Sequence, residues 1–166
     1  MMRRGRRDGL DDPPPGTVTL IYRENQAAVR RWAADRARRA GLAPERVGDL
    51  VIAVGELAGN TLLHTSRPGT LTIWEADGKI ICQVQDSGQI NDPLAGTRRL
   101  DPADPGRGRG LWVVNQLCDL VEMRTGTGGT TIRLHMRLPA QPGHEQPETR
   151  PPRGSTGRRL SRRLRM

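Results

Sequence analysis

The chain has 166 residues, a length that favours one domain with flanking segments over two domains. Its formal net charge is +9, 34% of its residues are hydrophobic and none is phenylalanine, so the core must be aliphatic. No apolar run approaches the length of a membrane span, no secretory signal follows the basic start, and two distant cysteines argue against a disulfide scaffold or a structural metal site. We therefore expect a cytoplasmic protein in which Cys82 and Cys118 are buried thiols.

Both ends of the chain have a composition that is typical of disorder. Residues 1–16 close with Asp-Asp-Pro-Pro-Pro-Gly, and residues 139–166 are rich in proline, glycine and arginine. The sequence therefore predicts a disordered basic N-terminal tail, a folded domain over 17–138 and a disordered arginine-rich C-terminal tail.

The first half of the predicted domain contains a short strand and two helices. The strand covers 17–22, and Asn25 is placed to cap a helix that runs to about Ala40. A longer helix is expected from Pro44, a residue type favoured in the first turn, to about His64. The apolar face of this second helix consists of Val47, Leu50, Val51, Val54, Ala58 and Leu62.

The second half of the domain follows the two-residue period of strands. Strands over 71–75 and 79–85 flank Asp77-Gly78, a pair that strongly favours a tight hairpin turn. Residues 87–109 are rich in glycine, proline and aspartate and exceed the length of an ordinary loop, so we interpret them as a lid. The remaining expected elements are a helix over 110–120 and strands over 120–125 and 130–138.

This order of elements predicts an α/β (α+β) fold of two layers, with helices covering one face of a mixed, mostly antiparallel sheet. In the last strand apolar and polar residues alternate, so that one set faces the helices and the other faces outward. The inward set is Ile132, Leu134, Met136 and Leu138, and the outward set is Thr131, Arg133, His135 and Arg137.

The long helix carries the first polar motif. Glu56 and Asn60 are four residues apart, which places both side chains on one helix face. They can belong to a solvated face. They can also form a partly buried site in which the amide oxygen binds a hard cation and the carboxylate accepts a proton.

The second motif, Asp86-Ser87-Gly88, stands at the end of a strand. Asp86 can accept backbone N–H groups in a turn. It can also accept the 6-amino group of adenine, because a carboxylate is an acceptor only and Gly88 lets a planar base approach the backbone.

In the third motif Gly106, Gly108 and Gly110 alternate with arginine ahead of an apolar helix. This pattern fits a flexible linker, and it also fits a loop whose backbone N–H groups bind polyphosphate at a helix N-terminus. It is not a Walker A loop, because no Lys-Ser/Thr pair follows.

Together these motifs resemble, in order and spacing, those of the histidine-kinase-like (GHKL, or Bergerat-fold) ATPases, and among them the small stand-alone serine/threonine kinases that act as bacterial anti-sigma factors. The resemblance extends over about residues 17–138. The chain departs from the usual pattern at Thr61, where alanine is more common, and at Ile90, where a glycine is more common. The matching segments are 56–64 (N box), 86–88 (G1 box), 106–111 (G2 box) and 128–130 (the final glycine-threonine element).

The resemblance implies a Bergerat ATP-binding fold with an ATP lid, and ATP and Mg²⁺ as its ligands. In this family pattern Glu56 would be the general base, Asn60 would coordinate Mg²⁺, and Asp86 would hold the adenine amino group. The further nucleotide-binding residues would be Gly88, Gly106, Arg107, Gly108, Arg109, Gly110, Leu111 and Thr130.

The implied activity is that of an ATP-dependent protein serine/threonine kinase that binds a sigma factor and phosphorylates an anti-anti-sigma antagonist. Relatives of this kind often form homodimers, but the sequence assigns no surface to such a contact. A second hypothesis is a nucleotide-gated protein-binding module without kinase activity. A third is a binder of nucleic acid or membrane surfaces through the basic segment 158–165, which equally fits a solubilising tail.

Overall fold

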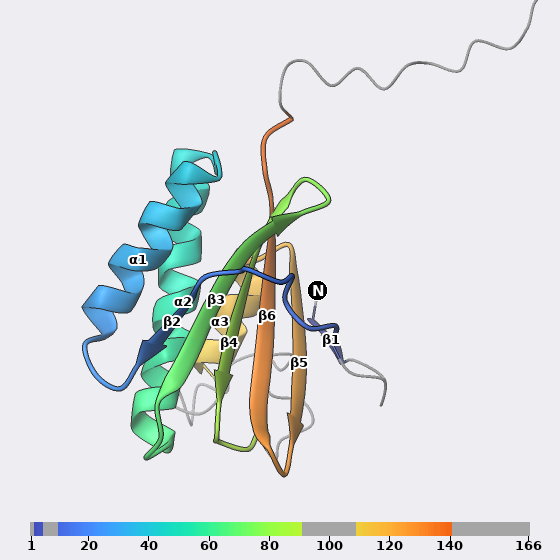
Figure 1. Cartoon of the computed structure of the whole chain (residues 1–166). Helices are drawn as coiled ribbons and strands as arrows, with labels where there is room; N and C mark the ends of the chain where they lie inside the picture. The colour runs from blue at the N-terminus through green and yellow to red at the C-terminus, as the bar shows by residue number, and fades with distance from the viewer. Residues whose placement is uncertain (1, 5–9, 91–108, 141–166) are drawn as a thin grey trace, which may run out of the picture.

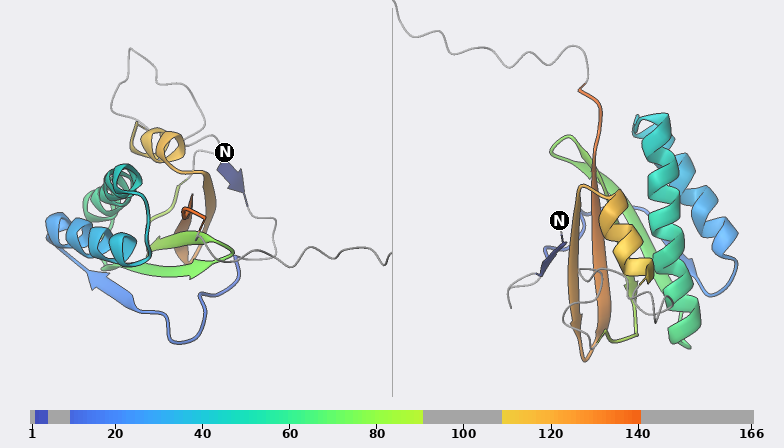
Figure 2. Two further views of the ribbon diagram at one scale, coloured as in Figure 1. Left: turned by 90° about the horizontal axis from the view of Figure 1, so that it is seen from above. Right: turned by 180° about the vertical axis from the view of Figure 1, so that it is seen from behind.

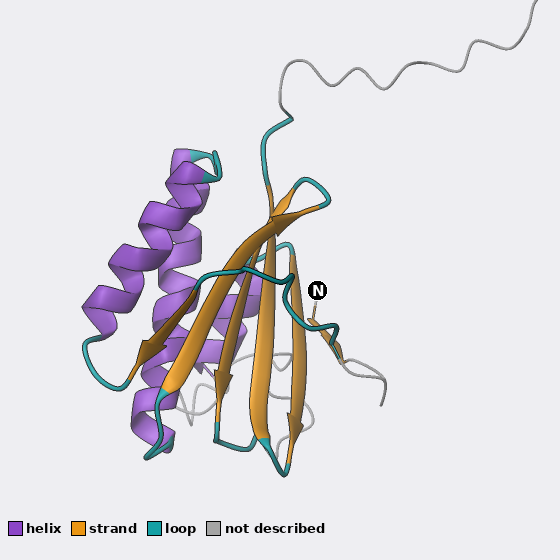
Figure 3. Ribbon diagram, in the orientation of Figure 1, coloured by secondary structure: helices purple, strands orange, loops and turns teal. Residues whose placement is uncertain are grey.

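The computed structural model describes residues 2–4, 10–90 and 109–140, and these form two layers. One layer is a six-stranded sheet, and the other consists of helices on a single face of that sheet (Figures 1 and 3). In the described ranges no helix is long and apolar enough to cross a membrane. The elements are β1 (Met2–Arg4), β2 (Thr19–Tyr22), α1 (Gln26–Arg39), α2 (Pro44–His64), β3 (Gly69–Ala76), β4 (Lys79–Asp86), α3 (Arg109–Leu117), β5 (Leu120–Gly126) and β6 (Gly129–Arg137).

The sheet confirms the predicted fold class. Its strand order is β1-β5-β6-β4-β3-β2, and every neighbouring pair is antiparallel except β1 with β5. The sheet is therefore mixed and mostly antiparallel, as the order of elements in the sequence predicted. The view from above in Figure 2 shows the helices on one side of the sheet and the chain that leads into β2 on the other.

The local signals in the sequence explain where the helices begin and end. The side chain of Asn25 accepts the backbone N–H of Ala28 at 3.1 Å and caps α1, and α2 has the predicted bounds. Asp77 and Gly78 adopt positive φ in the β3–β4 turn. Helix α3 ends three residues before the predicted position, because the N–H of Asp119 already bonds to the carbonyl of His135 in β6.

The N-terminal segment makes contacts that the tail interpretation of residues 1–16 did not include. Residues 2–4 pair with β5, and the chain after Leu10 crosses the outer face of the sheet (Figure 1). There the guanidinium of Arg133 donates to the backbone oxygen of Asp11 and to Gln83, and lies 5.1 Å from the centre of the Trp74 ring. Arg133 points outward as predicted, but it is only 8% exposed because this segment covers it.

The space between the two layers holds an aliphatic core that includes both cysteines. Cys82 on β4 is fully buried, and Cys118 after α3 is nearly so, which confirms two buried thiols. Burial raises the pKa of Cys82 above its usual range and raises the pKa of Cys118 to about 12. The largest buried aliphatic side chains are Leu50, Leu71, Ile80, Leu134 and Met136.

These thiols should make the protein lose stability in alkaline solution. Both have a pKa raised from 9.0, so the unfolded chain releases their protons first. Their contribution to stability is complete below pH 9 and falls above it by up to about 1.4 kcal/mol per pH unit for each thiol. Urea unfolding between about pH 8 and pH 10.5 measures this slope. The Cys82→Ala/Cys118→Ala variant should show a shallower slope above pH 9, and an unchanged slope would contradict the assignment.

Candidate functional site

The polar motifs of the sequence meet at one end of the sheet, drawn lowermost in Figure 1. Helix α2 and strand β4 both end there, α3 begins there, and β5 turns into β6 there. Segments that are far apart in the sequence thus contribute side chains to a common region.

Glu56 and Asn60 face the first turn of α3. A Cβ atom added to Gly110 would lie 2.9 Å from Glu56 Oε2 and 3.4 Å from Asn60 Nδ2, so the α3 backbone approaches this pair closely. Leu111 is buried in the core and anchors this turn, whereas Arg109 is exposed. The backbone of the first turn of α3 therefore adjoins a carboxylate and an amide on α2.

Asp86 has both carboxylate oxygens engaged. Its Oδ1 accepts the backbone N–H of Gly88 at 2.9 Å, and its Oδ2 accepts the hydroxyl of Thr61 at 2.8 Å. The side chain is only partly buried. Each oxygen also has a second lone pair, so Asp86 forms the turn contact and can accept a further donor.

Thr130 links the start of β6 to the chain that follows β4. It is the β6 partner of Asp86 in the sheet register, and its hydroxyl donates to the carbonyl of Gly88 at 2.7 Å. The hydroxyl of Thr125 lies 3.0 Å from that of Thr130 and accepts the N–H of Ile90 at 3.1 Å. Two threonine hydroxyls therefore hold residues 88–90 against the β5–β6 hairpin.

Gly129 allows this close approach of the hairpin to Asp86. Its φ is +113°, and a Cβ there would overlap the backbone oxygen of Asp86. Gly129→Ala should therefore lower the free energy of unfolding by roughly 2–4 kcal/mol through backbone strain and steric overlap. Gly128→Ala is the matched control, because a Cβ at Gly128 meets nothing within 4 Å and should change stability by less than about 0.5 kcal/mol. Equal denaturant midpoints for the two variants would contradict this account.

Part of the predicted site lies outside the described residues. This applies to Gly106, Arg107 and Gly108, and to most of the predicted lid over 87–109. Of the predicted residues that the structure describes, Glu56, Asn60 and Gly110 form one group. Asp86, Gly88 and Thr130 form the other, and Asn60 and Thr61 are the neighbouring positions on α2 that join the two groups.

Three residues in this region were not predicted as site residues. Thr61 bonds to Asp86, Tyr22 donates its hydroxyl to Thr61, and Thr125 supports Thr130. The sequence did mark Thr61, because the family pattern more often has alanine at this position. The contact with Tyr22 joins positions that are 39 residues apart, and no local pattern indicates it.

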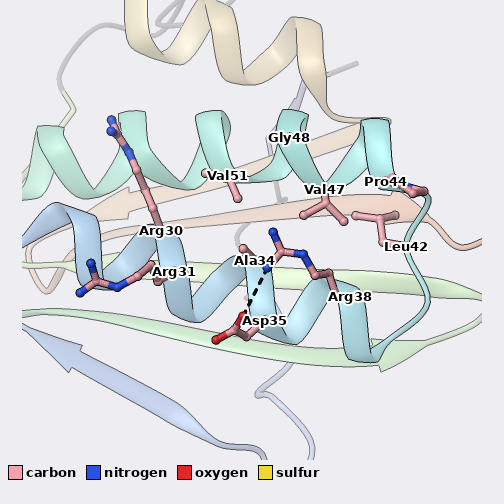
Figure 4. A pocket seen from close by; sticks show the side chains of 10 residues that line it. All are labelled: Arg30, Arg31, Ala34, Asp35, Arg38, Leu42, Pro44, Val47, Gly48 and Val51. Carbon is pink, nitrogen blue, oxygen red and sulfur yellow. Dashed lines mark hydrogen bonds and ion pairs between the residues drawn. The ribbon is translucent and has the colours of Figure 1, made fainter.

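A separate open groove of about 870 Å³ lies between α1 and α2 (Figure 4). Arginine and apolar side chains line this groove, and none of the predicted site residues is among them. The lining residues are Arg30, Arg31, Ala34, Asp35, Arg38, Leu42, Pro44, Val47, Gly48 and Val51.

Comparisons with known proteins agree with this arrangement. The family model described as a histidine kinase-like ATPase domain matches residues 22–136. The fold is similar to the crystal structure of the RsbU and RsbW domains of Rv1364c from Mycobacterium tuberculosis, with a TM-score of 0.55 and 22% sequence identity. The similarity covers 74% of this chain and 33% of that chain, so this chain matches about a third of the length of its relative.

Proposed function

We propose, since this chain belongs to the family of histidine kinase-like ATPase domains, that it binds ATP where α2, β4 and α3 meet. The observation that carries the proposal is the convergence of separate motifs. Glu56 and Asn60 adjoin Gly110 at the start of α3, and the next residue of α2 bonds to Asp86. These groups suit the two ends of a nucleotide.

Asp86 suits the adenine end. Its carboxylate only accepts hydrogen bonds, so it matches the 6-amino group of adenine and opposes the 6-oxygen of guanine. Gly88 and Thr130 adjoin it and would complete the surroundings of the base.

The start of α3 suits the phosphate end. The N–H groups in the first turn of a helix and the positive end of its dipole favour an anion. In the described residues no three acidic, histidine or cysteine side chains gather as a cation site of their own. The amide oxygen of Asn60 nevertheless fits Mg²⁺ that arrives with ATP, since this ion takes few protein ligands besides phosphate oxygens. Bound there, Mg²⁺ would neutralise phosphate charge.

Glu56 suits the role of general base. Its carboxylate lies at the first turn of α3, next to the proposed phosphate position. It would accept the proton of a serine or threonine hydroxyl as the hydroxyl oxygen bonds to the γ-phosphorus. The bond from that phosphorus to the oxygen of ADP would break, leaving ADP and a phosphorylated protein.

For the substrate we propose an anti-anti-sigma antagonist protein, with a sigma factor as the second partner of this chain. The proposed setting is the regulation of transcription in the cytoplasm. The support for this step is the motif resemblance to anti-sigma kinases and the similarity to a structure that contains an RsbW domain.

Incubation with Mg-ATP and candidate antagonist proteins, followed by mass spectrometry, tests this function. We expect one phosphoserine or phosphothreonine on an antagonist and release of that antagonist from the complex. ATP binding without phosphate transfer to any candidate would favour the nucleotide-gated binding module. The absence of ATP binding would overturn the proposal.

A further inference from the structure

A chain of three hydrogen-bonded side chains leads from the core to Asp86. The hydroxyl of Tyr22 donates to Thr61 Oγ1 at 3.1 Å, and Thr61 Oγ1 donates to Asp86 Oδ2 at 2.8 Å. Tyr22 is 4% exposed and Thr61 is 1% exposed, so water has little access to either contact. Asp86 is thus coupled through hydrogen bonds to two buried residues.

The direction of this chain follows from the number of available protons. The carboxylate of Asp86 only accepts, so Thr61 gives it its single hydroxyl proton, and the oxygen of Thr61 is left to accept from Tyr22. The carbonyl of Leu57 is a second acceptor for that proton at 3.2 Å. The shorter distance and the negative charge favour Asp86. Donation by Tyr22 polarises the Thr61 hydroxyl and strengthens its bond to the carboxylate.

The packing around Tyr22 holds this chain in place. Gly69 is the β3 partner of Tyr22, and a Cβ there would lie 2.6 Å from the hydroxyl oxygen of Tyr22 and 2.8 Å from Thr61 Cγ2. The space for the tyrosine ring therefore depends on glycine at this position. Burial raises the pKa of Tyr22, so its hydroxyl keeps the proton that it donates.

The hydrogen bonds from Tyr22 through Thr61 restrain Oδ2 of Asp86, while a backbone N–H restrains Oδ1. Oδ2 is bonded to Thr61, and Oδ1 is bonded to the N–H of Gly88. Rotation of the carboxylate would break both bonds, so its plane and its remaining lone pairs keep one orientation. Without the Thr61 hydroxyl, only the backbone bond would remain.

We propose that Thr61, supported by Tyr22, is a positioning residue that sets the preference of this site for a 6-amino purine. This inference rests on the proposed function, in which Asp86 accepts the 6-amino group of ATP. A carboxylate with a fixed orientation discriminates between purines more sharply than a mobile one, because it cannot turn away from an unsuitable partner.

The test compares ATP with purine riboside triphosphate, which lacks the 6-amino group, by calorimetry. Thr61→Val keeps the shape of the side chain and removes its hydroxyl. We expect it to lower ATP affinity roughly tenfold and to leave the affinity for purine riboside triphosphate within about twofold. Thr61→Ser should restore the affinity ratio of the wild type. Thr65→Val is the matched control, because the Thr65 hydroxyl donates to the carbonyls of Thr61 and Arg67 instead of to Asp86.

Tyr22→Phe is a second, independent variant that tests the same inference, and it is sufficient if Thr61→Val does not fold. It should lower the ratio of the two affinities by about two- to fivefold. Because the tyrosine acts through the threonine, the Tyr22→Phe/Thr61→Val variant should match Thr61→Val alone.

Equal losses for both nucleotides would assign Thr61 a packing role and overturn the inference. An unchanged affinity ratio in Thr61→Val and Tyr22→Phe would also overturn it, while the proposed function would stand. A wild-type protein that binds neither nucleotide would overturn both.

Discussion

Glu56→Gln should slow phosphate transfer by roughly 10²–10⁴-fold while ATP affinity changes by no more than about threefold. Glutamine fills the same space beside Gly110, so the contact between α2 and α3 persists. It cannot take the proton of the attacking hydroxyl, and this proton acceptance is the contribution that the substitution removes. Single-turnover assays with excess protein measure the transfer step, and calorimetry measures ATP binding.

Asn60→Ala is the companion variant. Asn60 lies one helical turn from Glu56 on α2, and its loss should affect nucleotide binding instead of the transfer step. We expect it to weaken Mg-ATP binding itself, since it removes the amide oxygen proposed to contact Mg²⁺. Circular dichroism should show both variants folded. A Glu56→Gln protein that transfers phosphate at the rate of the wild type, or that unfolds, would contradict the role of Glu56 as a base.

Asp86→Ala should cost ATP binding about 1.5–3 kcal/mol, or roughly a 10- to 150-fold loss of affinity, because a hydrogen bond to a charged acceptor is removed. Wild-type protein should prefer ATP to GTP, and this preference should largely disappear in the variant. Calorimetric titration with each nucleotide measures both effects.

Asp35→Ala is the control for Asp86→Ala. It also removes one negative charge, but Asp35 lies on α1 and its contact is an exposed ion pair with Arg38. Its effect on either nucleotide should be small. Equal affinities of the wild-type protein for ATP and GTP would contradict adenine recognition by Asp86.

The sequence predicted features that depend on local chemistry. The cap at Asn25, proline at the start of α2 and the Asp77-Gly78 turn act over a few residues, and each lies where the pattern indicated. The two-residue period of β6 predicted its inward and outward faces, because a strand displays its neighbours on opposite sides. The spacing of Glu56 and Asn60 likewise required only the helical period.

Contacts between distant segments could not be predicted in this way. The burial of Arg133 depends on the N-terminal segment that crosses the sheet, and composition alone assigned that segment to a tail. The hydroxyl chain from Tyr22 through Thr61 to Asp86 joins three elements, and none of its residues has a local pattern that indicates the others. Such contacts are set by the sheet register and by helix packing.

The position of the nucleotide is tested most directly by hydrogen exchange with and without Mg-ATP. The account predicts slower exchange in peptides that cover 56–61, 86–90, 109–111 and 129–131, since these surround the proposed site. Peptides from α1, which line the groove of Figure 4 instead, should be unchanged. Protection confined to the α1 peptides, or no protection at 86–90 and 109–111 in a sample that binds ATP, would contradict a nucleotide site at this end of the sheet.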